Sequence, residues 1–277
     1  MDLSRELLLC KGLARTAGAM ALRLRADLMV DEKPNGEGAV TNADIAIDDY
    51  ICGELKREFP QDLIISEESF KDDGSPINGH RVWFIDPIDG TKGYVEGNDD
   101  FVVMIGLAID AVARMGVVYQ PVTDKLWCGI YYPEEGCRWA QKIEGDMATD
   151  LRAAPPGPVP HELNILASRS RRSLRQQVMI EQLCPSNVLY FGSVGLKAMM
   201  ILERHGDLYV AWSKRIKLWD TCAPTAIVRA AGANIAFIDG EPLVHKGPID
   251  HGRPIVFASF IPDTRMQEKL SRIKNQG

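Results

Sequence analysis

The sequence lacks the features that mark secreted, membrane-spanning and nucleic-acid-binding proteins. Its six cysteines include no Cys-x-x-Cys pair and no zinc-finger spacing with a histidine, so we expect reduced thiols in a cytoplasmic protein. We expect no signal peptide, because Lys11 and Arg15 interrupt the apolar run near the N-terminus. We also expect no membrane span, because no apolar stretch approaches the ~18 residues that one requires.

The chain also lacks an excess of positive charge. Its formal net charge is -6, so a nucleic-acid polymer is not an expected partner, because its phosphates would be repelled. A small phosphate ester stays compatible with this charge if bound cations reverse the local field. With 45% hydrophobic and 25% charged residues, the 277-residue chain has the profile of a globular protein with one or two domains.

The first half of the chain predicts two helices followed by strands. Apolar residues at helical spacing over 3–28 predict a long amphipathic helix. Ile47, Ile51 and Leu55 lie on one face of a second helix, which Pro60 ends. Short apolar runs with turn residues behind them predict strands. These strands cover residues 63–66, 82–85, 101–109 and 113–119, with a weaker candidate at 125–132.

The second half alternates strands and helices after a proline-rich segment. Residues 153–160 (Ala-Ala-Pro-Pro-Gly-Pro-Val-Pro) are incompatible with a helix interior or a central strand and predict a linker. We therefore predict an N-terminal α+β domain (1–152) and a C-terminal α/β domain (161–277). The expected strands are 163–167, 188–191, 208–212, 234–238 and 255–259. The expected helices are 173–183, 196–204, 221–231 and 264–273.

Two carboxylates three residues apart mark the most informative segment, Asp-Pro-Ile-Asp-Gly-Thr at 86–91. Pro87 keeps Asp86 extended, and the glycine that follows Asp89 permits a sharp turn, so both acids can face one cation. Thr91 adds a hydroxyl at a position suited to a helix N-terminus, where backbone N–H groups favour phosphate. An ordinary solvated turn explains the same residues equally well.

Four further acids lie where predicted elements begin or end. Glu67 and Glu68 close the strand before this segment, and for Glu68 an exposed loop position is the favoured interpretation. Asp44 lies at the start of the second helix, where it can also form a capping pair with Thr41. Asp220 precedes the predicted helix 221–231 and can serve as its N-cap.

Clustered carboxylates repel one another, and a bound cation relieves that repulsion. The candidate ligands are all oxygens, with no histidine or cysteine among them, so the set favours Mg²⁺ or Mn²⁺ over zinc.

Three motifs together resemble those of the inositol monophosphatase superfamily. They are Leu-Ile-Ile-Ser-Glu-Glu-Ser at 63–69, Trp-Phe-Ile-Asp-Pro-Ile-Asp-Gly-Thr at 83–91 and Lys-Leu-Trp-Asp-Thr-Cys-Ala-Pro at 217–224. Further segments resemble the 3'(2'),5'-bisphosphate nucleotidase branch, including 93–97, 116–121, 167–170 and Gly192-Ser193 followed by Leu196-Lys197. The branch usually has histidine where this chain has Arg171. The resemblance implies a layered αβαβα fold of the sugar-phosphatase type.

The resemblance also implies roles for individual residues and two or three Mg²⁺ ions. Glu67, Asp86 and the Ile88 carbonyl would hold the first ion, and Asp86, Asp89 and Asp220 the second. Asp44 with Thr91 would orient the attacking water. The Gly90 and Thr91 amides would bind the phosphate, and Ser193 and Lys197 would contact the nucleotide. A solvated helix position explains Lys197 equally well.

The expected activity is hydrolysis of the 3'-phosphate of adenosine 3',5'-bisphosphate to AMP and phosphate, and adenine itself rests on the resemblance alone. An inositol or sugar phosphate monophosphatase with the same metal site is the alternative. A binding or regulatory protein with weak catalysis is a third. A homodimer stays open, because the sequence does not fix the oligomeric state.

Overall fold

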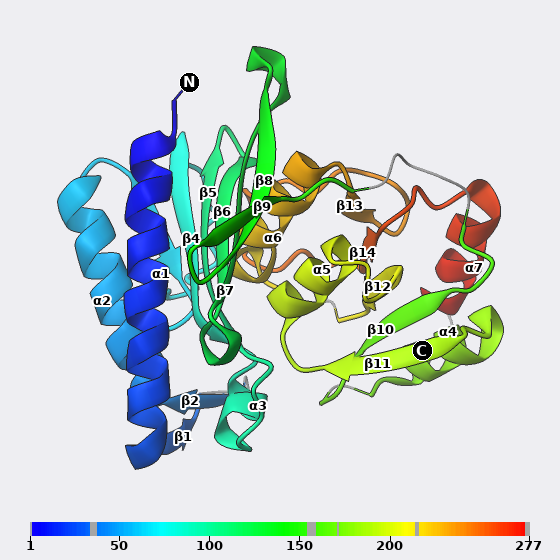
Figure 1. Cartoon of the computed structure of the whole chain (residues 1–277), viewed down its shortest axis with the longest axis horizontal. Coiled ribbons are helices and arrows are strands. Elements are labelled where there is room, and N and C mark those ends of the chain that lie inside the picture. Colours follow the sequence, from blue (N-terminus) through cyan, green and yellow to red (C-terminus); the bar gives the residue numbers. More distant parts are fainter. Residues whose placement is uncertain (1, 34–37, 154–158, 171, 214–215, 275–277) are drawn as a thin grey trace.

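The protein is built from five alternating layers of helices and sheets, as the resemblance implies. The computed structural model describes residues 2–274 except 34–37, 154–158, 171 and 214–215. From left to right in Figure 1 lie two helices, a seven-stranded sheet, two central helices, a five-stranded sheet and two outer helices. The linker segment and Arg171 fall wholly or partly outside the described residues, and the division into two domains stays a prediction.

The larger sheet has the order β3-β4-β5-β6-β7-β8-β9. Its first pair, β3 and β4, is parallel, and the other neighbours are antiparallel. The strands are β3 (Leu63–Ser66), β4 (Arg81–Asp89), β5 (Val102–Ile109), β6 (Val112–Gln120), β7 (Lys125–Tyr132), β8 (Cys137–Glu144) and β9 (Met147–Asp150).

Helices cover both faces of this sheet. Helices α1 (Ser4–Leu24) and α2 (Asn42–Glu58) pack on one face, and α5 (Val194–Leu202) and α6 (Leu218–Ala231) lie on the other. Strand β5 is buried along its whole length, with Val103 and Ile105 facing α1 and α2, and Val102 and Met104 facing the central layer. Coverage of both faces explains why the strand is a continuous apolar run rather than an alternating one.

The smaller sheet has the order β11-β10-β12-β14-β13. Helices α4 (Leu174–Leu183) and α7 (Thr264–Lys274) cover its outer face. Its strands are β10 (Asn164–Ser168), β11 (Asn187–Phe191), β12 (Leu208–Ala211), β13 (Asn234–Phe237) and β14 (Ile255–Ala258).

Helix α6 approaches the large sheet closely because three glycines lie in register beneath it. Gly106, Gly116 and Gly129 are cross-strand neighbours on β5, β6 and β7. A Cβ atom on Gly116 would lie 2.2 Å from the Ala223 carbonyl oxygen, and one on Gly106 would lie 2.6 Å from the Ala223 nitrogen. The glycine row therefore sets the depth at which α6 packs, and with it the position of Asp220.

The structure corrects several predicted boundaries. The first helix ends at Leu24 and continues only as a 3-10 turn, η1 (Arg25–Asp27), rather than reaching residue 28. Helix α6 begins at Leu218 instead of residue 221, so Asp220 lies within its first turn and is not its N-cap. Four strands were not predicted, namely β1 (Val30–Glu32), β2 (Ala39–Thr41), β8 and β9. Short turns η3 (Pro121–Thr123) and η4 (Pro133–Glu135) complete the chain, together with α3 (Thr91–Val95).

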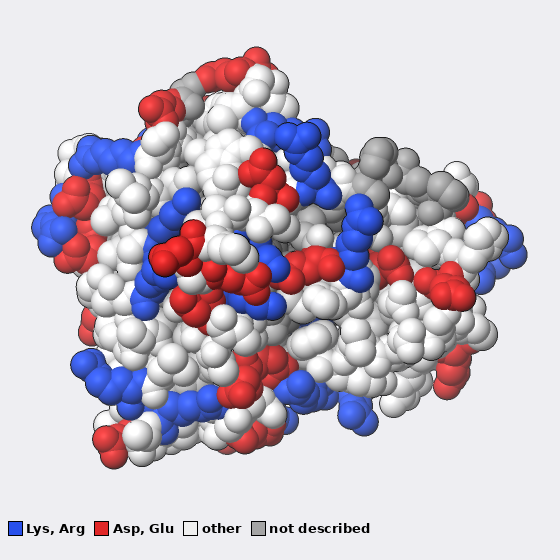
Figure 2. Space-filling model, in the orientation of Figure 1, with Lys and Arg blue, Asp and Glu red and all other residues white. Residues whose placement is uncertain are grey.

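The remaining general features agree with the sequence. The thiols of all six cysteines, each of which is described, are free. On the face in Figure 2, acidic and basic side chains are interspersed rather than gathered into one basic surface. Among the described residues, the helices fall short of the combined length and apolar character that crossing a bilayer requires.

Candidate active site

Three carboxylates from distant parts of the chain meet at one edge of the large sheet. Asp86 lies near the end of β4, Glu67 follows the parallel strand β3, and Asp220 lies in the first turn of α6. Each offers a carboxylate oxygen within 4.8 Å of the others. The parallel pairing of β3 with β4 explains why Glu67 arrives beside Asp86, and the Glu67 N–H donates to the Ile85 carbonyl at 3.2 Å.

Asp86 is the most deeply buried acid of this group. Its residue is 1% exposed, and its Oδ1 has no hydrogen-bond partner in the part of the chain that the structure describes. Burial raises the pKa of Asp86 well above its usual range, and the negative charges of Glu67, Asp89 and Asp220 raise it further. A buried carboxylate oxygen without a donor, among three other acids, fits a cation that binds there.

Asp89 is held by the N-terminus of α5. Its Oδ2 accepts hydrogen bonds from the Ser193 hydroxyl at 2.6 Å and from the Gly195 N–H at 2.7 Å. Burial raises the pKa of Asp89, while these hydrogen bonds and the charge of Lys197 lower it. A register shift in the β4–β5 pairing between Asp86 and Asp89 lets both acids leave the strand near the site.

The turn after Asp89 depends on a glycine. Gly90 has φ of +103°, which side chains rarely allow, and a Cβ there would lie 3.2 Å from the Asp100 carbonyl oxygen. Helix α3 then begins at Thr91, so the predicted helix start after this turn is confirmed.

Asp44 forms the predicted capping pair with Thr41 and also lies beside Thr91. Its Oδ2 accepts from the Thr41 N–H at 2.8 Å and the Thr41 hydroxyl at 2.6 Å, which completes the capping box of α2. Its Oδ1 lies 3.5 Å from the Thr91 hydroxyl, which also donates to the Ile88 carbonyl at 2.9 Å. Burial raises the pKa of Asp44 to about 6, the Thr41 hydrogen bonds lower it, and the Glu67 charge raises it.

Lys33 is a site residue that sequence reasoning missed. Its ammonium contacts Glu67 Oε1 at 2.6 Å and Glu68 Oε1 at 2.8 Å. The Glu68 side chain is only 7% exposed, so the interpretation of Glu68 as an exposed loop acid is wrong. Burial raises the pKa of Glu68 to about 7, the Glu67 charge raises it further, and Lys33 lowers it. A single lysine in a polar segment gave no signal that could have found this pair.

Ser193 and Lys197 lie beneath the site rather than on its surface. Both residues are 0% exposed. The Lys197 ammonium donates to the carbonyls of Phe191, Gly192 and Ser193 at 3.3, 3.1 and 2.5 Å. It also lies 4.8 Å from the centre of the Tyr209 ring. The interpretation of Lys197 as a solvated helix lysine is therefore wrong, and its contacts fix the loop that carries Ser193.

A second buried acid joins this loop to the large sheet. Asp100 is 8% exposed and accepts from the Arg169 guanidinium at 2.7 Å and from the Gly192 N–H. Asp100 was not predicted as part of the site. Hydrogen bonds of Asp89 and Asp100 thus connect β4, the start of α5 and the end of β10 beside the acidic cluster of Glu67, Asp86 and Asp220.

The chain resembles proteins of known activity over most of its length. The sequence profile of the Inositol monophosphatase family matches residues 4–270. The Rattus norvegicus 3'(2'),5'-bisphosphate nucleotidase 1 is 30% identical over 259 residues, which cover 81% of this chain and 80% of the relative. The Escherichia coli (strain K12) 3'(2'),5'-bisphosphate nucleotidase CysQ is 32% identical over 206 residues, which cover 74% and 78%.

Solved structures share the fold at lower sequence identity. A Thermotoga maritima IMPase has a TM-score of 0.81 and 21% identity, with 98% of this chain and 99% of that chain covered. An IMPase/NADP phosphatase in complex with Mg²⁺ and phosphate has a TM-score of 0.74 and 19% identity, with 98% and 94% covered. The αβαβα layering is therefore an arrangement that these proteins have in common.

Proposed function

Because the chain belongs to the inositol monophosphatase family, we propose that it is a metal-dependent phosphatase that hydrolyses the 3'-phosphate of adenosine 3',5'-bisphosphate to AMP and phosphate. The observation that carries the chemistry is the group of three carboxylates around the buried Asp86, whose Oδ1 has no hydrogen-bond partner among the described residues. The similarity to 3'(2'),5'-bisphosphate nucleotidases from a mammal and a bacterium supports the choice of substrate.

The acids of this site can hold metal, and the proposed number is two or three Mg²⁺ ions. Glu67, Asp86 and the Ile88 carbonyl would hold one ion, and Asp86, Asp89 and Asp220 would hold a second. All of these donors are oxygens, as Mg²⁺ prefers. When bound, the ions supply positive charge for the phosphate and lower the pKa of a water molecule.

Asp44 and Thr91 are the proposed residues that handle the attacking water. The hydroxyl of Thr91 donates to Asp44 Oδ1 at 3.5 Å, so a water between the site and this pair can be oriented by both. Asp44 accepts the proton that the water loses, and its raised pKa suits that role near neutral pH. The backbone N–H groups of Gly90 and Thr91 are the proposed donors to the phosphate oxygens.

Ser193 and Lys197 are better assigned as positioning residues than as nucleotide contacts. Lys197 fixes the carbonyls of the loop, the loop places Ser193, and Ser193 orients Asp89 by a 2.6 Å hydrogen bond. Because both side chains are fully buried, a nucleotide would reach them only after this loop had moved. Arg171, the proposed site of a changed nucleotide preference, lies outside the described residues.

A panel of phosphate esters with and without Mg²⁺ tests this function. We expect Mg²⁺-dependent release from adenosine 3',5'-bisphosphate and little from inositol 1-phosphate. The reverse preference would replace this proposal with the inositol or sugar phosphatase alternative. Absence of release from every ester would favour a binding protein instead. An Arg171→His variant, compared on the same panel, tests whether that residue alters nucleotide preference.

A further inference from the structure

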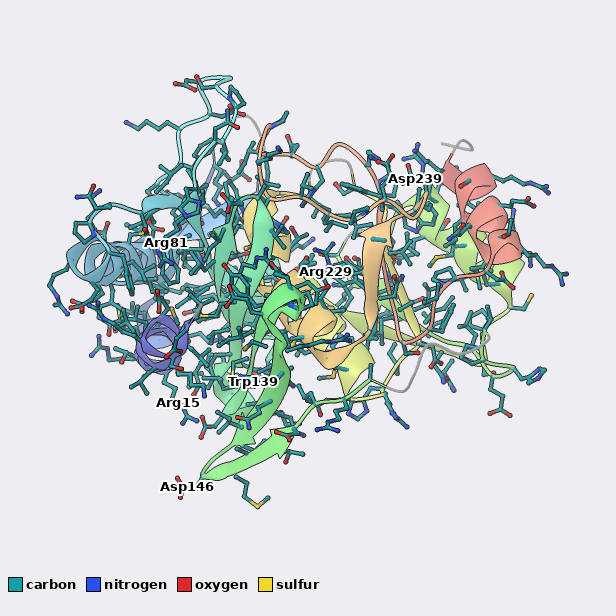
Figure 3. All side chains as sticks on the ribbon, turned by 90° about the horizontal axis from the view of Figure 1, so that it is seen from above. Arg15, Arg81, Trp139, Asp146, Arg229 and Asp239 are labelled. Atoms are coloured by element: carbon teal, nitrogen blue, oxygen red, sulfur yellow. The ribbon has the colours of Figure 1, made fainter. Side chains whose placement is uncertain are left out.

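A polar cavity lies away from the acidic cluster, at the junction of the two sheets. Its volume is about 490 Å³, and Arg114, Arg229, Tyr131, Glu134, Asn234 and Gly240 are among the residues that line it. Figure 3 shows Arg229 between the strands of the two sheets, where α6 passes between them. This volume lies within the range of cavities that hold small ligands.

Both arginines of this cavity retain unused hydrogen-bonding capacity. Among the described residues, Arg229 donates a single hydrogen bond, from Nη2 to the Leu243 carbonyl at 3.3 Å, and forms no ion pair with an acid. Arg114 contacts Glu134 at 2.5 Å and the Tyr131 carbonyl at 3.3 Å. Its Nε is nevertheless buried without a partner in the part of the chain that the structure describes.

The end of α6 does not require Arg229 as a cap. The Val228 carbonyl accepts from Gly232 and Ala233 N–H groups, and the Arg229 carbonyl also accepts from Gly232. The Ala230 carbonyl accepts from Arg138 Nε at 3.2 Å, and the Ala231 carbonyl accepts from the Ala153 N–H at 2.8 Å. The four final carbonyls of α6 therefore have partners already, and the Arg229 charge is available for another group.

The charge in the cavity is also unbalanced. Burial lowers the pKa of the Arg229 guanidinium; Tyr131 opposes this effect, and the positive charge of Arg114 adds to it. Glu134 is the only acid among the lining residues, and its half-exposed side chain already pairs with Arg114. Two neighbouring guanidinium groups with one carboxylate leave a net positive charge, which an oxyanion would offset.

We propose that Arg114 and Arg229 form a binding site for a phosphate or sulfate group, separate from the acidic cluster. Arginine presents planar donors that match the oxygens of such groups. The site lies near the opposite end of α6 from Asp220, nine residues or ~13 Å along the helix. The cavity is larger than one oxyanion, so the group can be free or attached to an organic molecule.

Isothermal titration of metal-free protein in EDTA tests this site. Without metal, the carboxylates of the acidic cluster repel anions, so that cluster should not contribute to the measured binding. Sodium sulfate is titrated against a sodium chloride blank at equal ionic strength. We expect saturable binding by the wild-type protein and at least about tenfold weaker binding by Arg229→Met. Arg253→Met is the matched control, because Arg253 already pairs with Asp239 and Glu241. The Arg253→Met variant should bind sulfate with the same affinity as the wild type.

A labelling experiment on the wild-type protein locates the site without depending on any variant. Sulfate should protect the peptide that contains Arg229 from phenylglyoxal, as measured by mass spectrometry. Absence of saturable sulfate binding, equal binding by wild type and Arg229→Met, or unprotected Arg229 would each overturn the proposal. AMP in the same titration distinguishes the ligand source. If AMP binds more tightly than sulfate and Arg229→Met loses this binding, the ligand is a phosphorylated organic molecule. If AMP binds more weakly than sulfate, the ligand is a free oxyanion. Both results support the site.

Discussion

The two ends of helix α6 carry opposite kinds of unbalanced charge. At the N-terminal end, Asp220 meets Glu67 and Asp86 within 4.8 Å, so negative charge is in excess. At the C-terminal end, Arg229 and Arg114 line one cavity, in which Glu134 is the only acid among the described lining residues. Charges that serve stability alone are usually paired when buried. The comparison teaches that each end of α6 suits an external ion of opposite sign, a cation at one end and an oxyanion at the other.

The largest effect should come from removing charge at the acidic end. Asp89→Asn keeps the side-chain size but loses the carboxylate proposed to hold a metal, and we expect kcat to fall about 100- to 1000-fold. Steady-state phosphate release under saturating Mg²⁺ measures this. Asp99→Asn is the matched control, because the Asp99 side chain is 64% exposed and pairs with Arg25 at the surface. Full activity of Asp89→Asn would show that Asp89 is not a metal ligand.

A second prediction concerns stability with and without metal. In EDTA at neutral pH, Asp86→Asn should be more stable than wild type by about 3 kcal/mol, because it removes a repelled buried charge. The folded-state pKa of Asp86 is raised, so this advantage should shrink as falling pH protonates the wild-type carboxyl. Saturating Mg²⁺ should reverse the order, since only wild type keeps the ligand. Urea unfolding in both buffers gives the two values, and an unchanged order would contradict the metal site.

The third prediction tests whether Lys197 positions the loop before α5 or contacts the nucleotide. Lys197→Met leaves three loop carbonyls without their donor, and we expect a loss of about 1–3 kcal/mol in the free energy of unfolding with a lower kcat. The KM for adenosine 3',5'-bisphosphate should stay close to the wild-type value. Lys92→Met, at an exposed position beside Glu96, serves as the control. A large rise in KM with unchanged stability would instead make Lys197 a nucleotide contact.

The smallest expected effect lies at the residue after Asp220. The Thr221 hydroxyl lies 3.2 Å from His245 Nε2 and 2.7 Å from His251 Nε2, and it also donates to the Leu218 carbonyl at 3.2 Å. Thr221→Val removes this shared partner, and we expect a loss of about 1 kcal/mol in the free energy of unfolding. Thr221→Ser should retain most of the stability because it keeps the hydroxyl. Thermal unfolding of both variants decides whether the hydroxyl is the relevant group.

The sequence predicted the strands and helices that are strongly apolar. Strand β5 and helix α4 were found within one residue of their observed ends because their patterns are clear. Strands β1 and β9 were missed because every residue in them is exposed, so no buried face creates an alternating pattern. Strand β8, which lies between β7 and the edge strand β9, is only partly buried and was missed for a similar reason. The glycine row beneath α6 depends on strand register, which sequence spacing does not reveal.

For the site, sequence reasoning found the acids but not their supporting contacts. Glu67, Asp86 and Asp220 come together as expected, because β3, β4 and α6 end or begin at one sheet edge. Lys33 and Asp100 were missed, since each lies directly beside other charged residues in a polar segment and does not stand out from them. The pair of His245 and His251 looked unrelated in sequence, yet both rings contact the Thr221 hydroxyl and lie edge to face with centroids 5.8 Å apart. Long-range pairing of this kind becomes visible only when the fold is known.

Direct titration of Mg²⁺ into metal-free protein tests the central claim most closely. Because burial raises the pKa values of Asp44 and Glu68 to about 6 and about 7, we expect metal binding near neutral pH to release protons and to weaken as the pH falls. The account predicts saturable Mg²⁺ binding by wild type at pH 7.5, weaker binding at pH 5.5, and loss of binding in Asp86→Asn. Equal binding by wild type and Asp86→Asn, or no binding by either, would contradict it.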